Sequence, residues 1–233
     1  MKISCKKIFS LIIVAILLIS STGCDSSESK INSNSQLASA KKIMMENLNN
    51  FSYEASITVK TGIMDVTTTM DCKEDRQNQI GYCSSSTIGV QTEEYFDYKN
   101  MIDYTRTYSP YSSDASNGVW QKTKIENNNT NSWLNLNDYI FNITEESKNG
   151  GVYYTGTIDS KKLAAAMSTV KSDIDMKKIV SDDINIAVFV NSSGYIEQMS
   201  FDMEIMGIDE VVEVNFSGFN TTGIISIPTE VKG

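Results

Sequence analysis

Two pairs of glutamates are the residues whose type and spacing could support acid–base chemistry. Glu93 is followed directly by Glu94, and Glu210 lies three positions before Glu213. Two carboxyl groups that flank a glycosidic bond, roughly 5 to 10 Å apart, can hydrolyse it. Glutamates at such spacing are equally typical of the solvent-facing side of a sheet. A hydrolase that uses two carboxyl groups is therefore one hypothesis. The alternative, which we expect, is that these glutamates lie on the water-exposed face of a sheet.

Acidic side chains also gather further along the chain, where they raise the question of a metal site. The cluster consists of Asp173, Asp175, Asp182 and Asp183, and carboxylate oxygens are ligands that calcium prefers. The cluster lacks the spacing of a helix-loop-helix calcium loop, so we expect a solvated connection instead. The sequence contains no histidine, which removes the usual general base and the commonest metal ligand. We expect no metal, no cofactor and no enzymatic activity.

Cys72 and Cys83 raise the question of a disulfide. They flank a polar segment, residues 73–78, and a hairpin centred there would set the two cysteines opposite each other. The alternation of side chains argues against this pairing, because Ile80 and Tyr82 define an apolar face of the second strand and leave Cys83 on the other face. A bulge at Gly81 would reconcile the two arguments. A disulfide and two half-buried thiols both stay open.

Residues 1–23 have the three parts of a secretory signal peptide. Lysines precede an apolar stretch at residues 8–19, and small residues follow it. The stretch is shorter than the roughly 20 residues of a membrane-spanning helix, which favours cleavage over an uncleaved anchor. The sequence Thr22-Gly23-Cys24 resembles the lipobox of bacterial lipoproteins, although Ser21 stands where leucine is usual. This resemblance implies that Cys24 becomes the first residue and carries a diacylglycerol.

The charge of the chain limits its partners. The net charge is −9, and without residues 1–23 the balance is 17 basic against 29 acidic residues, or −12. So acidic a protein is a poor partner for nucleic acid and is repelled by anionic lipid head groups. Residues 24–35 are mostly small and polar, as in a flexible linker. We expect a domain, residues 36–233, tethered by its lipid to the extracytoplasmic face of the cell membrane.

Hydrophobic periodicity from residue 36 onward predicts one α+β domain. Residues 36–50 carry apolar side chains every three or four positions, as an amphipathic helix does. From residue 51 the period changes to two, which predicts a series of antiparallel strands. Further helices are expected at residues 133–143 and 161–171. Besides a strand around Ile80 and Tyr82, the expected strands are 51–59, 64–72, 89–98, 101–108, 119–125, 152–158, 184–190, 199–205, 212–216 and 225–231.

Methionine is frequent at the apolar positions of these elements. Because methionine adapts its shape, methionine-rich linings suit binding surfaces for lipids and varied apolar partners. Ordinary packing of a core explains the same pattern and is the alternative. The residues that would line a cavity are Met44, Leu48, Ile57, Met64, Met70, Met167, Met199, Phe201 and Met203.

The order and spacing of several short segments resemble the LolA-like and LppX/LprG-like lipoproteins. The resemblance covers residues 36–231 and implies a strongly curved antiparallel half-barrel, covered by helices, around an apolar cavity. It implies no particular binding residue, because the cavity wall in this fold is a surface and not a motif. The segments that carry it are 51–55, 94–104, 120–122, 153–156, 193–196 and 225–228.

Together these observations predict a membrane-anchored, non-enzymatic lipoprotein that binds a lipid or another hydrophobic ligand between its sheet and its helices. The alternative is an interaction or sensor module on the cell surface that has a filled core and no small ligand. The function implied by the resemblance is an analogy at the level of the fold. The sequence identifies neither the ligand nor a protein partner.

Overall fold

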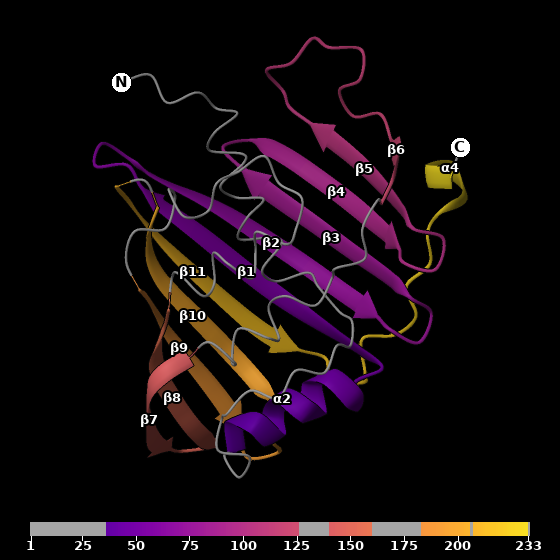
Figure 1. Ribbon diagram of the computed structural model, residues 1–233. Helices are drawn as coiled ribbons and strands as arrows, with labels where there is room; N and C mark the ends of the chain where they lie inside the picture. Colours follow the sequence, from indigo (N-terminus) through magenta and orange to yellow (C-terminus); the bar gives the residue numbers. More distant parts are fainter. Residues whose placement is uncertain (1–35, 126–139, 160–182, 206, 233) are drawn as a thin grey trace. The chain divides into compact units, whose positions relative to one another are not determined.

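A computed structural model describes residues 36–125, 140–159, 183–205 and 207–232 (Figure 1). In these residues eleven strands form one antiparallel sheet in the order β6-β5-β4-β3-β2-β1-β11-β10-β9-β8-β7. The elements are α2 (Gln36–Glu46), β1 (Asn50–Lys60), β2 (Asp65–Asp75), β3 (Ile80–Thr87), β4 (Val90–Asp97), β5 (Ile102–Tyr108), β6 (Gln121–Lys124), β7 (Ile140–Lys148), β8 (Gly151–Ile158), β9 (Ile184–Asn191), β10 (Ile196–Ile205), β11 (Ile208–Ser217) and α4 (Thr229–Lys232). No helix among the described residues combines the length and the apolar character that crossing a bilayer requires.

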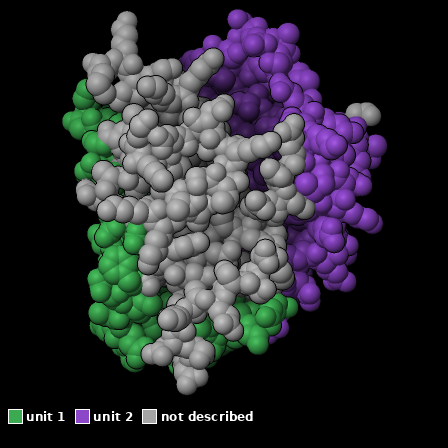
Figure 2. Space-filling view, viewed as in Figure 1, with its two compact units in different colours: residues 1–46, 57–65, 129–213 green, residues 47–56, 66–128, 214–233 purple. Residues whose placement is uncertain are grey.

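The chain divides into two compact units (Figure 2). Unit 1 comprises residues 1–46, 57–65 and 129–213, and unit 2 comprises residues 47–56, 66–128 and 214–233. Strands β1 and β11 each contribute residues to both units.

In unit 1, helix α2 lies against β9 and β10. Its apolar positions Leu37, Ala40 and Met44 are almost completely buried, as the three- and four-residue spacing predicts. The strands alternate in the same way: Val188 of β9 pairs with Met199 of β10, and both side chains are buried. Residues paired directly across two antiparallel strands share a face, so the buried positions of β9 and β10 form one apolar surface.

In unit 2, strands β2 to β6 follow one another as antiparallel hairpins. Two of the connections repeat one design. Asp75 accepts hydrogen bonds from the backbone and side chain of Asn78, and Asp97 does the same for Asn100. The residue after each asparagine has a positive φ, which closes a four-residue loop.

The C-terminal segment differs from the predicted strand at residues 225–231. It contains helix α4, and Ile227 and Val231 form a small buried cluster with Tyr104 of β5. Pro228 explains the difference, because it has no N–H to donate to a neighbouring strand, and its carbonyl instead accepts a hydrogen bond from Val231 N. The turn that follows brings Val231 into the cluster with Ile227 and Tyr104.

The predicted helix at residues 133–143 is wrong over its described part, because residues 140–143 belong to strand β7. Ile140 and Ile143 lie three positions apart, which fits a helix but not the period of two of a regular strand. Pairing with β8, with a register shift between Phe141 and Thr144, makes the segment a strand. The helix expected at residues 161–171 lies outside the described residues. The amphipathic helix predicted for residues 36–50 is confirmed as α2, which ends at Glu46.

Candidate functional site

The residues predicted to line a cavity lie for the most part on buried faces. The buried ones are Met44, Leu48, Ile57, Met70, Met199, Phe201 and Met203. Met64 differs, with 62% of its surface exposed. It precedes β2 and belongs to a turn in which its N–H donates to Thr61 Oγ1. Met167 lies outside the described residues.

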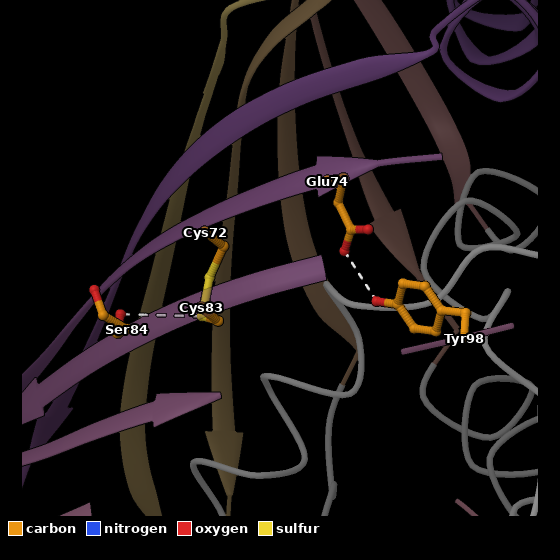
Figure 3. The surroundings of a disulfide bond; sticks show 5 residues. All are labelled: Cys72, Glu74, Cys83, Ser84 and Tyr98. Carbon is orange, nitrogen blue, oxygen red and sulfur yellow. Dashed lines mark hydrogen bonds between the residues drawn. A yellow bond between two sulfur atoms is a disulfide. The ribbon is translucent and has the colours of Figure 1, made fainter. Parts of the chain in front are cut away.

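Cys72 of β2 and Cys83 of β3 are joined by a disulfide (Figure 3). The two residues are directly paired, and the register runs without a bulge from Thr68↔Thr87 to Asp75↔Ile80. Cys83 is therefore on the same face as Cys72, and both are buried. The argument that placed Cys83 on the opposite face was wrong, because Tyr82 does not lie on the buried face of β3.

Beyond the disulfide, the buried face of unit 2 becomes polar at Glu74. The Tyr98 hydroxyl donates a hydrogen bond to Glu74 Oε1 at 3.1 Å (Figure 3). Glu74 Oε2 is buried and has no hydrogen-bond partner among the residues that the structure describes. Burial raises the pKa of Glu74 to about 7, although the Tyr98 hydrogen bond and the positive charge of Arg76 act in the opposite direction. At neutral pH this carboxyl is thus balanced between its charged and its neutral form.

Gly81 makes the contact between Glu74 and Tyr98 sterically possible. Gly81 pairs with Glu74 across β2 and β3. A Cβ at this position would lie 2.9 Å from the Tyr98 hydroxyl and 3.4 Å from Glu74 Oε1. The 2.9 Å separation is shorter than real Cβ atoms show, so a larger residue at position 81 would displace the Tyr98 hydroxyl from its place over β3.

Further ionisable groups lie on the same face of unit 2. Burial and then the negative charge of Asp103 raise the pKa of Glu94 to about 7. Burial also raises the pKa of Asp103, against a hydrogen bond from Thr105. The pKa of Tyr53 is raised by burial and by the charges of Glu74 and Glu94. The tyrosine is thus electrostatically linked to both carboxyl groups, and the face combines an apolar part with a polar margin.

The glutamate pairs considered for hydrolysis do not converge on a common point. Glu93 and Glu94 are neighbours in β4, so their side chains leave opposite faces of the sheet. Glu210 of β11 is buried, which raises its pKa to about 7, whereas Glu213 is exposed. Neither pair can flank one bond of a substrate.

Of the four aspartates in the cluster, only Asp183 belongs to the described residues, and its side chain is exposed. The other three lie outside the described residues. Among the described residues, no group of three or more acidic or cysteine side chains is arranged to hold a metal ion.

Sequence reasoning missed Glu74, although the signal was present. The buried series Val66, Thr68, Met70 and Cys72 continues in steps of two to Glu74, so the period itself places this carboxyl inside. The partner Tyr98 had no such signal. It lies in a loop after β4, where side-chain direction depends on turn geometry and not on alternation.

Hollows on the described surface have a different character from the predicted cavity. One in unit 2, of about 570 Å³, is lined mostly by hydroxyl, amide and carboxylate groups, and Met70 is the only predicted lining residue that contributes to it. A second, in unit 1, is formed by residues of β7 to β10 that include Thr144, Thr155, Ser200 and Asp202. Both are polar hollows on the face opposite the buried one.

Comparison with solved structures finds several that match most of this chain. The Mycobacterium tuberculosis lipoprotein LppX matches with a TM-score of 0.50 and 14% sequence identity, over 82% of this chain and 94% of LppX. A putative outer membrane lipoprotein-sorting domain from Vibrio parahaemolyticus (10% identity, TM-score 0.33) covers 82% of this chain and 93% of its own length. A LolA superfamily protein from Nitrosomonas europaea (10% identity, TM-score 0.32) covers 84% and 96%.

The likeness to LppX confirms, at the level of the fold, the resemblance that the sequence suggested. No protein-family model matches the sequence, and no curated protein matches it. The likeness therefore concerns architecture, and the function has to be argued from the chain's own residues.

Proposed function

We propose that this chain is a membrane-anchored, extracytoplasmic lipoprotein without enzymatic activity that binds a lipid or another hydrophobic ligand. The observation that carries the proposal is the apolar face of the sheet. In unit 2 it includes Phe51, Tyr53 and Phe216, whose rings pack within about 6 Å of one another, and all three are buried. A broad apolar surface of this kind suits the acyl chains or rings of a ligand.

The polar margin of this face would receive the polar end of such a ligand. Glu74 Oε2 is buried and accepts no hydrogen bond from the described part of the chain, and a buried acceptor without a partner costs free energy. A hydroxyl or amine of a ligand head group would satisfy it. An amphipathic ligand, with its tail against the apolar part and its head at Glu74, fits this arrangement better than a purely apolar one.

Two further observations support the membrane-anchored part of the proposal. The sequence Thr22-Gly23-Cys24 follows an apolar stretch with lysines before it, and LppX, whose fold is similar, is itself a lipoprotein. A diacylglyceryl group on Cys24 would hold the chain stably at the membrane, and residues 24–35 would serve as the tether.

Binding of the fluorescent apolar probe N-phenyl-1-naphthylamine tests the proposal. We expect saturable binding that a Val66→Phe substitution weakens at least fivefold, because the added ring occupies the buried face of β2. Thr67→Phe adds a ring to the exposed face one residue away and serves as the matched control, with no expected effect. Thermal unfolding shows whether each variant folds. The proposal fails if the unmodified chain binds no probe, or if both variants bind it equally well.

A further inference from the structure

The sheet face opposite the buried one carries a hollow that the proposed function does not use. Its floor consists of Ser84 and Ser86 of β3. Register places Asp71 and Glu93 on either side of Ser84, and Thr69 and Gln91 on either side of Ser86. The small serines lie between longer side chains on both neighbouring strands, and this difference in size creates the depression. We call it the serine hollow.

The serine hollow is accessible and large enough for a small ligand. Its volume is about 570 Å³, within the range of roughly 300 to 1,000 Å³ that is typical of small-molecule sites. Thr69, Asp71, Ser86 and Gln91 are exposed. All the lining residues belong to unit 2.

The lining determines which ligand chemistry fits. Six lining residues are serine or threonine, Gln91 and Asn215 contribute amides, and Glu54, Asp71 and Glu93 contribute carboxylates. Among the described residues no lysine or arginine lines the hollow, so a phosphate, sulfate or carboxylate ligand would meet the carboxylates of Glu54 and Asp71 without a cation in the lining to compensate them. Carboxylates accept hydrogen bonds, whereas hydroxyls and amides both donate and accept. A ligand rich in neutral hydroxyl groups can satisfy all of them together.

One side of the serine hollow is held in place before any ligand arrives. Glu93 accepts a hydrogen bond from the Tyr82 hydroxyl at 3.3 Å and another from Arg106 Nε at 3.0 Å. Arg106 is fixed in turn by stacking over the Trp120 ring, 4.7 Å from its centroid. The ion pair with Arg106 also offsets the negative charge of Glu93. The hollow therefore attracts a free cation less strongly than its carboxylates would without this partner. Preorganised polar groups of this kind lower the cost of binding.

Aromatic rings continue from the hollow along the same face. Tyr82 lines the hollow and packs against Tyr95 with ring centroids 4.9 Å apart, and Tyr95 packs against Trp120 at 5.7 Å. Tyr82 and Tyr95 are partly exposed. Aromatic surfaces beside hydrogen-bonding groups match the two kinds of surface on a sugar ring, its C–H faces and its hydroxyl edges.

We propose that the serine hollow binds a neutral sugar chain. This inference is independent of the hydrophobic ligand, because the two sites use opposite faces of the same strands. A protein with both sites would hold an apolar ligand on one side of its sheet and a neutral glycan on the other.

An array of neutral hexose and N-acetylhexosamine oligosaccharides tests the inference, followed by calorimetric titration of the best binder. The full chain is purified in a detergent without a sugar head group, which would otherwise compete. Asp71→Asn should weaken binding about tenfold, because it removes a charged acceptor, and Ser84→Leu should weaken it at least tenfold by filling the floor. Asp202→Asn, an exposed carboxylate of unit 1, is the matched control and should have no effect.

Three results would overturn the inference: no neutral oligosaccharide on the array binds, binding is unchanged in both Asp71→Asn and Ser84→Leu, or spermine displaces the bound sugar, which would assign the hollow to cations. Because Asp71→Asn is isosteric and exposed, loss of folding does not explain its effect. Binding of N-phenyl-1-naphthylamine should be the same in this variant, which separates the two sites.

Discussion

Glu74 is the residue whose ionisation most directly opposes folding. It is buried on β2, and its one hydrogen bond from Tyr98 does not compensate for the loss of water. The unfolded chain ionises this carboxyl near its ordinary pKa of 4.5, but the folded chain does so only at about 7. Between these values the folded state alone keeps the proton, so stability falls as the pH rises through this window and is lowest above it.

Glu74→Gln should remove this penalty. Above pH 7 we expect the free energy of unfolding to rise by about 3 kcal/mol, the equivalent of the pKa difference, and near pH 4.5 we expect almost no change. Urea unfolding at several pH values measures the effect. Glu204→Gln, at an exposed position of β10, should change little at any pH. A Glu74→Gln variant that is equally destabilised across the range would contradict the account.

The Cys72–Cys83 disulfide should contribute measurably to stability. It closes a loop with a sequence separation of 11, which corresponds to about 3 kcal/mol in the chain-entropy description. The double substitution Cys72→Ala and Cys83→Ala should lower the unfolding free energy by roughly that amount. Reducing agent should destabilise the unmodified chain and leave the double variant unaffected. If reduction leaves the unmodified chain as stable as before, the disulfide has no structural role.

Among the elements, the turns of unit 2 show which local features a sequence encodes clearly. The pattern Asp-x-x-Asn occurs at residues 75–78 and again at residues 97–100, and each copy forms the same loop. The strands expected at residues 89–98 and 101–108 correspond to β4 and β5, and the loop between them comprises residues 98–101. Asparagine and aspartate favour such turns through their own side chains, so local chemistry is enough to predict them.

The turn between β3 and β4 is a weak point. Ile88 has a φ of 45° and Gly89 a φ of 77°, and the left-handed region costs a β-branched residue about 1 to 2 kcal/mol. Ile88 is 61% exposed, so little burial is lost when it is replaced. Ile88→Asn should therefore raise the unfolding free energy by about 1 kcal/mol. Ile63→Asn, at an exposed isoleucine without a positive φ, should give no such gain in the same denaturation experiment.

Two elements were predicted wrongly, for different reasons. The strand at residues 140–148 pairs with β8, the next strand along the chain, but its apolar residues Ile140 and Ile143 lie three positions apart, which favours a helix. The C-terminal segment packs on Tyr104, which is far away in the sequence, and a local hydrophobic period does not contain that contact. The long alternating strands β1 and β9 were predicted well, because one buried face fixes the period over the whole strand.

At the scale of the whole molecule, the buried face was predictable and the contacts on it were not. Residues at period two identify a buried face; Ile57, Met70 and Phe201 lie on such faces, and the same period places Glu74 inside. The contact between Glu74 and Tyr98 depends on which residues a strand and a loop bring together, and no local pattern contains that information. The serine hollow depends in the same way on the cross-strand register.

Cys24→Ser tests how the molecule is attached to the membrane. The proposed diacylglycerol needs the thiol, so the variant should not incorporate labelled palmitate and should leave the membrane fraction. Ser21→Leu, which restores the usual lipobox residue, is the matched control and should stay in the membrane. A Cys24→Ser variant that stays in the membrane fraction to the same extent would rule out this mode of anchoring.

The most direct test of the account is native mass spectrometry of the full chain purified from membranes, followed by organic extraction and identification of what is released. We predict a noncovalently bound lipid or other apolar molecule that the Val66→Phe variant carries at lower occupancy and the Thr67→Phe variant carries unchanged. A chain whose measured mass contains no noncovalent ligand, and whose extract contains no apolar compound beyond its own anchor, would contradict the proposed function.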